Sequence, residues 1–218
     1  TFDQNAEQSS IDAVAKLTPK GAPDNLHIGI AAIRPGTGEV VAIYGGKDYV
    51  VRQLNDATQS IALAGSTFKP FALVAGLEAG IPLTSMWNGD TPQVFDDAGK
   101  PYEVNNYGDE GWGQIDLLTA TAHSVNTVYV PLGIKVGPDK VVDVARRAGI
   151  PDSVAMMPTP SVVLGAASPH VIDVATAYAT FAAQGVYVAP WFVSEVDGSN
   201  GGVLYQAATP TPTTVFSK

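Results

Sequence analysis

The chain has 218 residues, of which 45% are hydrophobic and only 15% are charged. This composition excludes a highly charged, disordered chain and is enough for one domain with a sizeable core. The 12 basic and 21 acidic residues leave a net charge of −9, which argues against binding to phosphate backbones. Because the chain contains no cysteine, thiolate metal sites, catalytic thiols and disulfides are excluded as well.

Neither an apolar run long enough to span a bilayer nor a stretch resembling a signal peptide is present in the sequence. The first residue is Thr1 and not methionine, so we expect the chain to be part of a longer protein. No internal repeat and no composition shift marks a domain boundary.

The N-terminal part of the chain predicts a helix followed by a β-hairpin. Apolar side chains recur at helical spacing over residues 6–17, and a proline follows that segment. Residues 27–34 and 39–44 are predicted strands, separated by the turn sequence Pro-Gly-Thr-Gly at 35–38. Apolar residues occupy both faces of the first strand, so we expect it to be buried on both sides.

Residues 45–64 are expected to form a loop that leads into a helix starting near Ser66. Pro70 supports this start, because proline is tolerated in the first turn, where the backbone N–H has no partner within the helix. We expect the helix to end at Gly80, a residue type that favours the position just after a helix.

The rest of the chain is predicted to be mainly helical. Residues 81–113 contain several prolines and turn sequences and are expected to be loops. Ser168 and Pro169 suit the N-cap and the first position of a helix. The predicted helices lie at 115–123, 127–134, 139–148 and 168–184, and a strand is predicted at 186–196.

The prediction therefore contains many helices but only two or three strands. A single hairpin is marginally stable in water. We therefore expect the sheet to be completed by another polypeptide, or by a part of the domain that this chain lacks.

A serine and a lysine three residues apart stand at the predicted helix start, in Ser66-Thr67-Phe68-Lys69. Residues at i and i+3 share one face of a helix, roughly 5–6 Å apart at Cβ. The lysine can take the proton from the serine hydroxyl, provided that burial lowers the pKa of its amine. The helix N-terminus also favours negative charge on the serine oxygen. The alternative is a helix-capping serine beside a solvated lysine, and the spacing alone does not separate the two.

Ser124-Val125-Asn126 lies between two predicted helices. Residues two apart in extended backbone point to the same side, so the hydroxyl and the amide can both line a cleft. The alternative is a helix cap followed by a turn, which serine and asparagine also favour.

In these motifs the chain resembles the transpeptidase domain of a class A penicillin-binding protein, part of the serine acyl-transferase group that includes β-lactamases. The resemblance spans nearly all of residues 25–190, in order. The segments that carry it are Thr37–Ala42 with Gly45-Gly46, Asn55–Gln59, Gly65–Phe71, Ser124–Thr127, Leu164-Gly165 and Ala175–Phe181.

The resemblance implies an α+β fold of the serine transpeptidase and β-lactamase type, with helices packed on an antiparallel sheet. It also implies a peptidoglycan D,D-transpeptidase that acts on D-Ala-D-Ala stem peptides through an acyl-enzyme and is acylated by β-lactams. By the same resemblance Ser66 is the nucleophile, its backbone N–H is half of an oxyanion hole, and Lys69 is the general base. Ser124 relays a proton to the leaving group, and Asn126 holds the amide of the stem peptide.

The resemblance further implies partners and a location. The partners are peptidoglycan stem peptides and β-lactams, with no nucleic acid. The three histidines are not spaced as metal ligands, so we expect no metal and no cofactor. The family works on the outer face of the bacterial cytoplasmic membrane, which implies an anchor and a glycosyltransferase domain upstream of Thr1.

One family motif, Lys-Thr/Ser-Gly on a strand, has no counterpart in this sequence. Lys135-Val136-Gly137 comes nearest, but valine stands where a hydroxyl is needed. We therefore expect a partial transpeptidase domain whose C-terminal strands are missing from this chain. Its parts are an N-terminal helix and linker at 1–24, a portion of the catalytic core at 25–208, and a Thr/Pro tail at 209–218 leading to the missing third-motif segment. The remainder is expected to accompany it, as a second chain or as uncleaved parent protein, since the isolated chain would be poorly folded or inactive.

Two other functions stay open. A D,D-carboxypeptidase or a β-lactamase-type hydrolase would use the same serine chemistry, although nothing here resembles the Glu-x-x-Leu-Asn segment that supplies the deacylating base in class A β-lactamases. A non-catalytic penicillin-recognising sensor or scaffold can keep the serine, lysine and asparagine residues intact.

Overall fold

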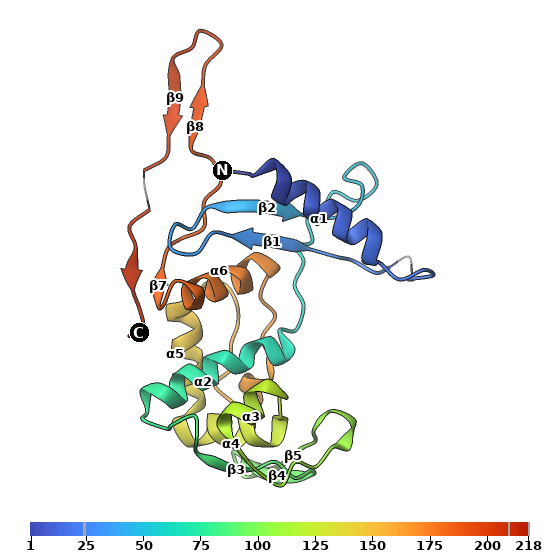
Figure 1. The fold of residues 1–218 in the computed structure, drawn as a ribbon, viewed down its shortest axis with the longest axis vertical. Helices are drawn as coiled ribbons and strands as arrows, with labels where there is room; N and C mark the ends of the chain where they lie inside the picture. Colours follow the sequence, from blue (N-terminus) through green and yellow to red (C-terminus); the bar gives the residue numbers. More distant parts are fainter. Residues whose placement is uncertain (24, 209, 218) are drawn as a thin grey trace. The chain divides into compact units, whose positions relative to one another are not determined.

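The computed structural model describes residues 1–23, 25–208 and 210–217. The chain divides into two compact units, each assembled from separated stretches of sequence (Figure 1). Unit 1 comprises Thr1–Ile61, Arg147–Pro151 and Pro169–Lys218, and unit 2 comprises Ala62–Arg146 and Asp152–Ser168.

Unit 1 is built around the predicted antiparallel hairpin, in which β1 (Ile30–Ile33) pairs with β2 (Val40–Tyr44). Helix α1 (Gln4–Leu17) packs on β2 and helix α6 (Val171–Ala182) packs on β1, so the hairpin lies between two helices (Figure 1). The sequence predicts that β1 is buried on both sides, but every residue of the strand is only half-buried. The reason is that each sheet in the described part of the chain has only two strands, which leaves an edge on both sides.

Side-chain caps set the starts of both helices in unit 1. The side chain of Asp3 accepts hydrogen bonds from two backbone N–H groups of the first turn of α1, which begins slightly earlier than predicted. The prediction that Ser168 caps α6 is wrong. The N-cap is His170, whose backbone N–H donates to Asp173 Oδ2 at 2.9 Å. This reciprocal bond at the third helical position delays the start of the helix.

The strand predicted at 186–196 is broken. Its first part forms β7 (Val186–Tyr187) and its end forms β8 (Glu195–Asp197). Pro190 has no N–H to donate to a sheet. Beside it, Trp191 leaves the strand direction and bonds to the hairpin instead: its N–H donates to the Gly38 carbonyl at 3.0 Å.

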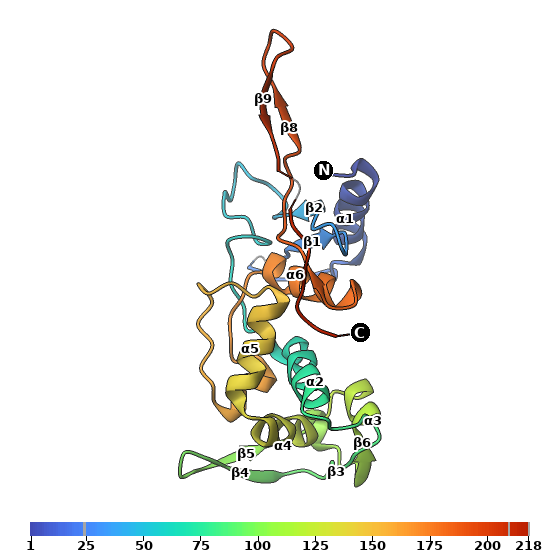
Figure 2. The ribbon, with the colours of Figure 1, turned by 90° about the vertical axis from the view of Figure 1, so that its left-hand side faces the viewer.

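Two further strands of unit 1 were not predicted. β10 (Thr213–Thr214) pairs with β7, and β9 (Val203–Gln206) pairs with β8. All residues of β8 and β9 are exposed, and this hairpin projects from the rest of unit 1 in both Figure 1 and Figure 2.

Unit 2 is a helical core with α4 (Asn126–Val136) at its centre. α4 packs against α2 (Lys69–Glu78) and against the 3-10 helix η3 (Pro160–Leu164). Its apolar residues at 128–130 and 132 are fully buried. Gly133 permits the close approach to η3, since a Cβ there would lie 2.3 Å from Val163 Cγ1.

Residues 81–113 are not all loop, so this prediction is wrong. They contain three strands, and a fourth follows at 114–116; together the four form two antiparallel pairs. The elements of unit 2 not yet given are η1 (Gly65–Phe68), β3 (Met86–Asn88), β4 (Gln93–Asp97), β5 (Lys100–Val104), η2 (Tyr107–Asp109), β6 (Gln114–Asp116), α3 (Leu117–Ala122) and α5 (Pro138–Ala148), the last of which ends in unit 1. β4 and β5 are joined by Ala98 and Gly99, both at positive φ. Alanine is not among the residue types that predict such a turn from sequence.

Helices and antiparallel strands together make an α+β fold, as predicted. The expected strand count is too low, because strands as short as β4 and β9 carry little alternation of apolar and polar residues. Within the described residues, no helix combines the length and apolar character needed to cross a bilayer.

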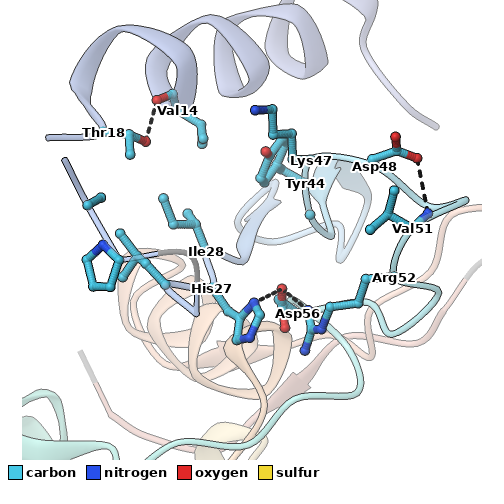
Figure 3. A pocket seen from close by; sticks show the side chains of 14 residues that line it. Val14, Thr18, His27, Ile28, Tyr44, Lys47, Asp48, Val51, Arg52 and Asp56 are labelled. Atoms are coloured by element: carbon cyan, nitrogen blue, oxygen red, sulfur yellow. Dashed lines mark hydrogen bonds and ion pairs between the residues drawn. The ribbon is translucent and has the colours of Figure 1, made fainter. Parts of the chain in front are cut away.

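In unit 1 a buried carboxylate ties the loop after β2 to the hairpin. Asp56 is 5% exposed and lies at the edge of an open cavity of about 530 Å³ (Figure 3). Its carboxylate accepts hydrogen bonds from Arg52 Nη1 and Ser60 Oγ, both at 2.5 Å. His27 Nδ1 lies 3.9 Å away, and the Asp56 N–H donates to the Gly45 carbonyl at 2.8 Å. Burial alone would raise the pKa of Asp56, but the hydrogen bonds and nearby positive charge hold it below its ordinary value.

Asp56→Asn is expected to destabilise the protein by about 1–3 kcal/mol, because a buried ionic hydrogen-bond partner of Arg52 loses its charge. Since the folded-state pKa is depressed, this stabilisation is present above the ordinary aspartate pKa and is lost as the pH falls through the lower folded value. Thermal unfolding of the intact protein at pH 5–7 measures it, with Asp12→Asn on the exposed face of α1 as control. Equal unfolding midpoints for the two variants would contradict the assignment.

Candidate active site

Ser66 and Lys69 occupy the junction between η1 and α2. Ser66 lies in the 3-10 turn and is exposed, whereas Lys69 is the first residue of α2 and is only 3% exposed. Pro70 occupies the first turn of α2, as predicted. The three-residue spacing directs both side chains to one side: Lys69 Nζ lies 2.9 Å from Ser66 Oγ. The alternative of a solvated lysine is therefore wrong.

Ser124 lies between α3 and α4 in a backbone conformation rare for serine, with φ of 56°. The last turn of α3 closes around it, since the Ser124 N–H donates to the Thr121 carbonyl at 3.2 Å and the Val125 N–H to the Ala120 carbonyl at 3.0 Å. A non-glycine residue held there carries strain on the order of 1 kcal/mol. Ser124 is exposed at the end of α3, and Asn126 is the first residue of α4.

The amine of Lys69 joins all four predicted site residues. Besides Ser66 Oγ, it lies 2.9 Å from Ser124 Oγ, 2.7 Å from the Ser124 carbonyl and 2.6 Å from Asn126 Oδ1. An ammonium has three hydrogens for these four oxygens, and a neutral amine has two hydrogens and one lone pair, so either form engages three of them at a time. The hydroxyls of Ser66 and Ser124 can each donate to the lone pair of the neutral amine, so the geometry is compatible with that form.

Burial of Lys69 lowers the pKa of its amine to about 8. At pH 7 about one such amine in ten is neutral, against roughly one in 2,500 for an ordinary lysine. The ring of Tyr129, whose centroid is 5.8 Å from Nζ, offers the cation a weak counter-attraction. A sizeable fraction of the Lys69 amine is therefore neutral near neutral pH.

Asn126 is oriented from both ends of its amide. Oδ1 accepts from Lys69 Nζ, and Nδ2 donates to the backbone carbonyl of Asn105 at 2.8 Å. The sequence does not predict this contact, because Asn105 lies in the segment 81–113 that is expected to be loops and carries no signal of its own.

The turn that carries Ser66 is held against the segment after η3 by backbone hydrogen bonds. The Gly65 N–H donates to the Gly165 carbonyl at 3.3 Å, and the Ala64 N–H donates to the Ala167 carbonyl at 2.9 Å. A Cβ on Gly165 would lie 2.2 Å from the Gly65 backbone, and its φ is +74°. Gly165 thus holds Ser66 in place through the adjacent backbone.

Gly165→Ala is expected to slow acylation of the intact protein by a β-lactam by about 10-fold or more and to lower its stability, because the backbone before Ser66 must shift. Gly80→Ala is the matched control, since Gly80 has a φ of +79° but open space around its Cβ position. Both variants carry the conformational strain of about 1 kcal/mol, and only Gly165→Ala adds the clash. Similar acylation rates in the two variants would contradict the pinning role.

Among the described residues, no group of three His, Asp or Glu side chains is arranged to hold a metal ion. His123, next to Ser124 in sequence, instead stacks against Trp112 with ring centroids 4.2 Å apart.

Comparison with known proteins places this geometry in a family. The family model described as "Penicillin binding protein transpeptidase domain" matches residues 28–218. Penicillin-binding protein 1A of Mycobacterium tuberculosis is 37% identical over 96% of this chain and 26% of its own length. The Mycolicibacterium smegmatis protein of the same name is 35% identical over 95% of this chain and 27% of its own length. The chain thus spans about a quarter of these curated relatives.

Solved structures agree. PonA1 of Mycobacterium tuberculosis in complex with penicillin V superposes with a TM-score of 0.85 at 35% identity, over 96% of this chain and 57% of that one. The same PonA1 without a named ligand gives a TM-score of 0.86 at 32% identity, over 99% of this chain and 58% of that one. From the match to the family model, which covers most of its residues, the chain belongs to the penicillin-binding protein transpeptidase domain family.

Proposed function

We propose that the protein is a peptidoglycan D,D-transpeptidase that acts on D-Ala-D-Ala stem peptides through a serine acyl-enzyme. The observation that supports this most directly is the buried Lys69 amine, which lies 2.9 Å from the hydroxyls of both Ser66 and Ser124. A base with a pKa of about 8, in contact with an exposed serine hydroxyl, suits nucleophilic catalysis near neutral pH.

In the proposed acylation, the neutral amine of Lys69 takes the proton of Ser66 while Oγ attacks the carbonyl carbon of the D-Ala-D-Ala bond. The C–N bond breaks, Ser124 delivers a proton to the departing D-Ala amine and regains one from the Lys69 ammonium, and the acyl group remains on Ser66. An amine of a neighbouring stem peptide then attacks this ester, the bond between the acyl carbon and Ser66 Oγ breaks, and the proton lost by the attacking amine goes to Ser66. General-base help of this kind contributes about 10²–10⁴-fold.

Asn126 is assigned to substrate binding. One of its two Nδ2 hydrogens is used by the Asn105 carbonyl. We assign the other to the stem-peptide amide next to the scissile bond. A β-lactam would be attacked at its ring amide in the same way and would leave a stable ester on Ser66.

We also propose that the rest of the transpeptidase domain, including the third motif, accompanies this chain, with residues 25–208 forming part of the catalytic core. The enzyme would work on the outer face of the bacterial cytoplasmic membrane, held by an anchor outside these residues. The support is the family, together with the quarter of each curated relative that the chain covers.

The test incubates the intact protein with a pentapeptide stem that ends in D-Ala-D-Ala and with an acceptor stem, and follows the products by mass spectrometry. The expected result is release of D-Ala with formation of a cross-linked dimer, and a penicillin adduct that maps to Ser66. Release of D-Ala with hydrolysed tetrapeptide alone would overturn transpeptidation in favour of a carboxypeptidase. An adduct without any turnover would indicate a sensor, and no adduct would overturn the serine mechanism.

A further inference from the structure

Asn106 is a buried polar residue of unit 2 whose side chain is fully hydrogen-bonded. It is 6% exposed and follows β5 in the loop that precedes η2. Its Nδ2 donates to the carbonyls of Gly89 and Glu110, both at 2.9 Å. Its Oδ1 accepts from the N–H and the hydroxyl of Thr127, both at 3.1 Å. Two donors and two lone pairs are all that this amide offers, so every one is used.

The two ends of this amide bind different parts of the unit. Nδ2 connects the loop before β4 with the loop after β5, and Oδ1 binds the first turn of α4. Val125, the residue at the N-cap of α4, makes no side-chain cap bond. The Thr127 N–H lies in the first turn of α4, where backbone donors have no partner within the helix. Asn106, from a distant part of the sequence, accepts this hydrogen bond and so acts as the cap.

The cap also determines where the neighbouring carbonyl lies. Asn105 is joined directly to Asn106, and its carbonyl accepts from Asn126 Nδ2 at 2.8 Å. That bond turns Asn126 Oδ1 toward Lys69 Nζ, 2.6 Å away. Without it the Asn126 amide can rotate, which would place an NH₂ group against the lysine amine and move the substrate donor away.

We propose that Asn106 is a positioning residue for the acylation site: by anchoring the loop on α4, it holds the Asn105 carbonyl that orients Asn126 between Lys69 and the stem peptide. This inference rests on the proposed function of Asn126. Asn106 touches neither the reacting atoms nor Lys69, so its effect on the reaction must pass through Asn126.

The test is a double-mutant cycle in the intact protein, with the second-order rate constant for β-lactam acylation as the readout. Asn106→Ala is expected to lower this constant by about 10- to 100-fold, because a misplaced binding group has that effect. In an Asn126→Ala background the same substitution is expected to change it by less than about 3-fold, because the group it positions is gone.

Two further variants separate positioning from loss of stability. Thr127→Val removes one of the two hydrogen bonds to Asn106 Oδ1 and keeps the backbone N–H bond, so it should destabilise the protein less than Asn106→Ala. It should lower the acylation rate constant by a smaller factor, and this effect should also disappear in the Asn126→Ala background. Val141→Ala, in the fully buried face of α5, destabilises the same unit without a link to Asn126 and should leave acylation within about 2-fold of wild type.

The outcomes are distinct from those that test the function itself. If the wild-type protein forms no adduct on Ser66, the proposed function fails and the cycle has no reference rate. If wild type reacts at Ser66 but Asn106→Ala and Thr127→Val react at the wild-type rate, the inference is overturned. It is also overturned if their losses add to that of Asn126→Ala, or if Val141→Ala slows acylation equally.

Discussion

Ser66→Ala is expected to abolish covalent labelling of the intact protein by a fluorescent penicillin, with a loss of at least about 10⁴-fold in acylation rate. The bond that forms in the proposed reaction joins Ser66 Oγ to the lactam carbonyl carbon, so the variant has no atom to carry the acyl group. Because Ser66 is exposed, its truncation opens no cavity in the core, and the thermal unfolding midpoint should stay near that of wild type. Gel fluorescence and intact mass measure the labelling.

The matched control for that experiment is Thr67→Ala, the neighbouring exposed hydroxyl in the same 3-10 turn. Thr67 Oγ1 donates to the Ala64 carbonyl at 2.6 Å and takes no part in the proposed chemistry. This variant should label within a few-fold of wild type. Labelling of Ser66→Ala at the wild-type rate would exclude Ser66 as the nucleophile.

Lys69→Met is expected to lower the acylation rate constant by about 10²–10⁴-fold without lowering stability. In the proposed mechanism Lys69 must be neutral to act as the base, so the wild-type rate should rise with pH through the amine pKa of about 8 and level off above it. The variant should lack this titration. Stopped-flow or gel-based acylation rates between pH 6 and 10 provide the comparison.

The stability half of this prediction follows from the same burial. Because the folded-state pKa is depressed from 10.5 to about 8, the buried ammonium costs about 3 kcal/mol below pH 8, and that cost disappears as the pH rises above the unfolded value. Methionine removes the charge but also the hydrogen bonds to Ser124 and Asn126, so the net effect should be small or stabilising. A flat wild-type pH profile, or a variant that unfolds much earlier, would contradict this account of Lys69.

Local sequence signals predicted most of the helices. Pro70 marks the first turn of α2, Gly80 follows its end, and the hairpin of β1 and β2 lies where the Pro-Gly-Thr-Gly turn predicts it. Each of these rests on backbone restrictions of proline or glycine, which act within a few residues and need no tertiary contact.

The failures occurred where longer-range contacts or weak patterns decide the structure. The hairpin of β4 and β5 turns at Ala98-Gly99, and the sequences of its strands, QVFDD and KPYEV, contain too few alternating apolar residues for a strand to be predicted. Segment 186–196 breaks because Trp191 bonds to Gly38, far away in the chain. The division into two units could not be predicted from the sequence either, because each unit is assembled from stretches that are separated in sequence.

By itself, the sequence determined the residue types of the site and the three-residue spacing of Ser66 and Lys69, because a helical turn places i and i+3 on one side whatever surrounds them. The family resemblance then predicted the other two residues. Tertiary structure alone decided that Lys69 is buried, since the packing of α2 against α4 removes its amine from water and so lowers its pKa. It also brought Ser124 and Asn126 to that amine from more than fifty residues away, and it bound Asn106 to Thr127, the contact that we propose keeps Asn126 in its orientation. These contacts depend on how helices pack, which no local pattern of side chains encodes.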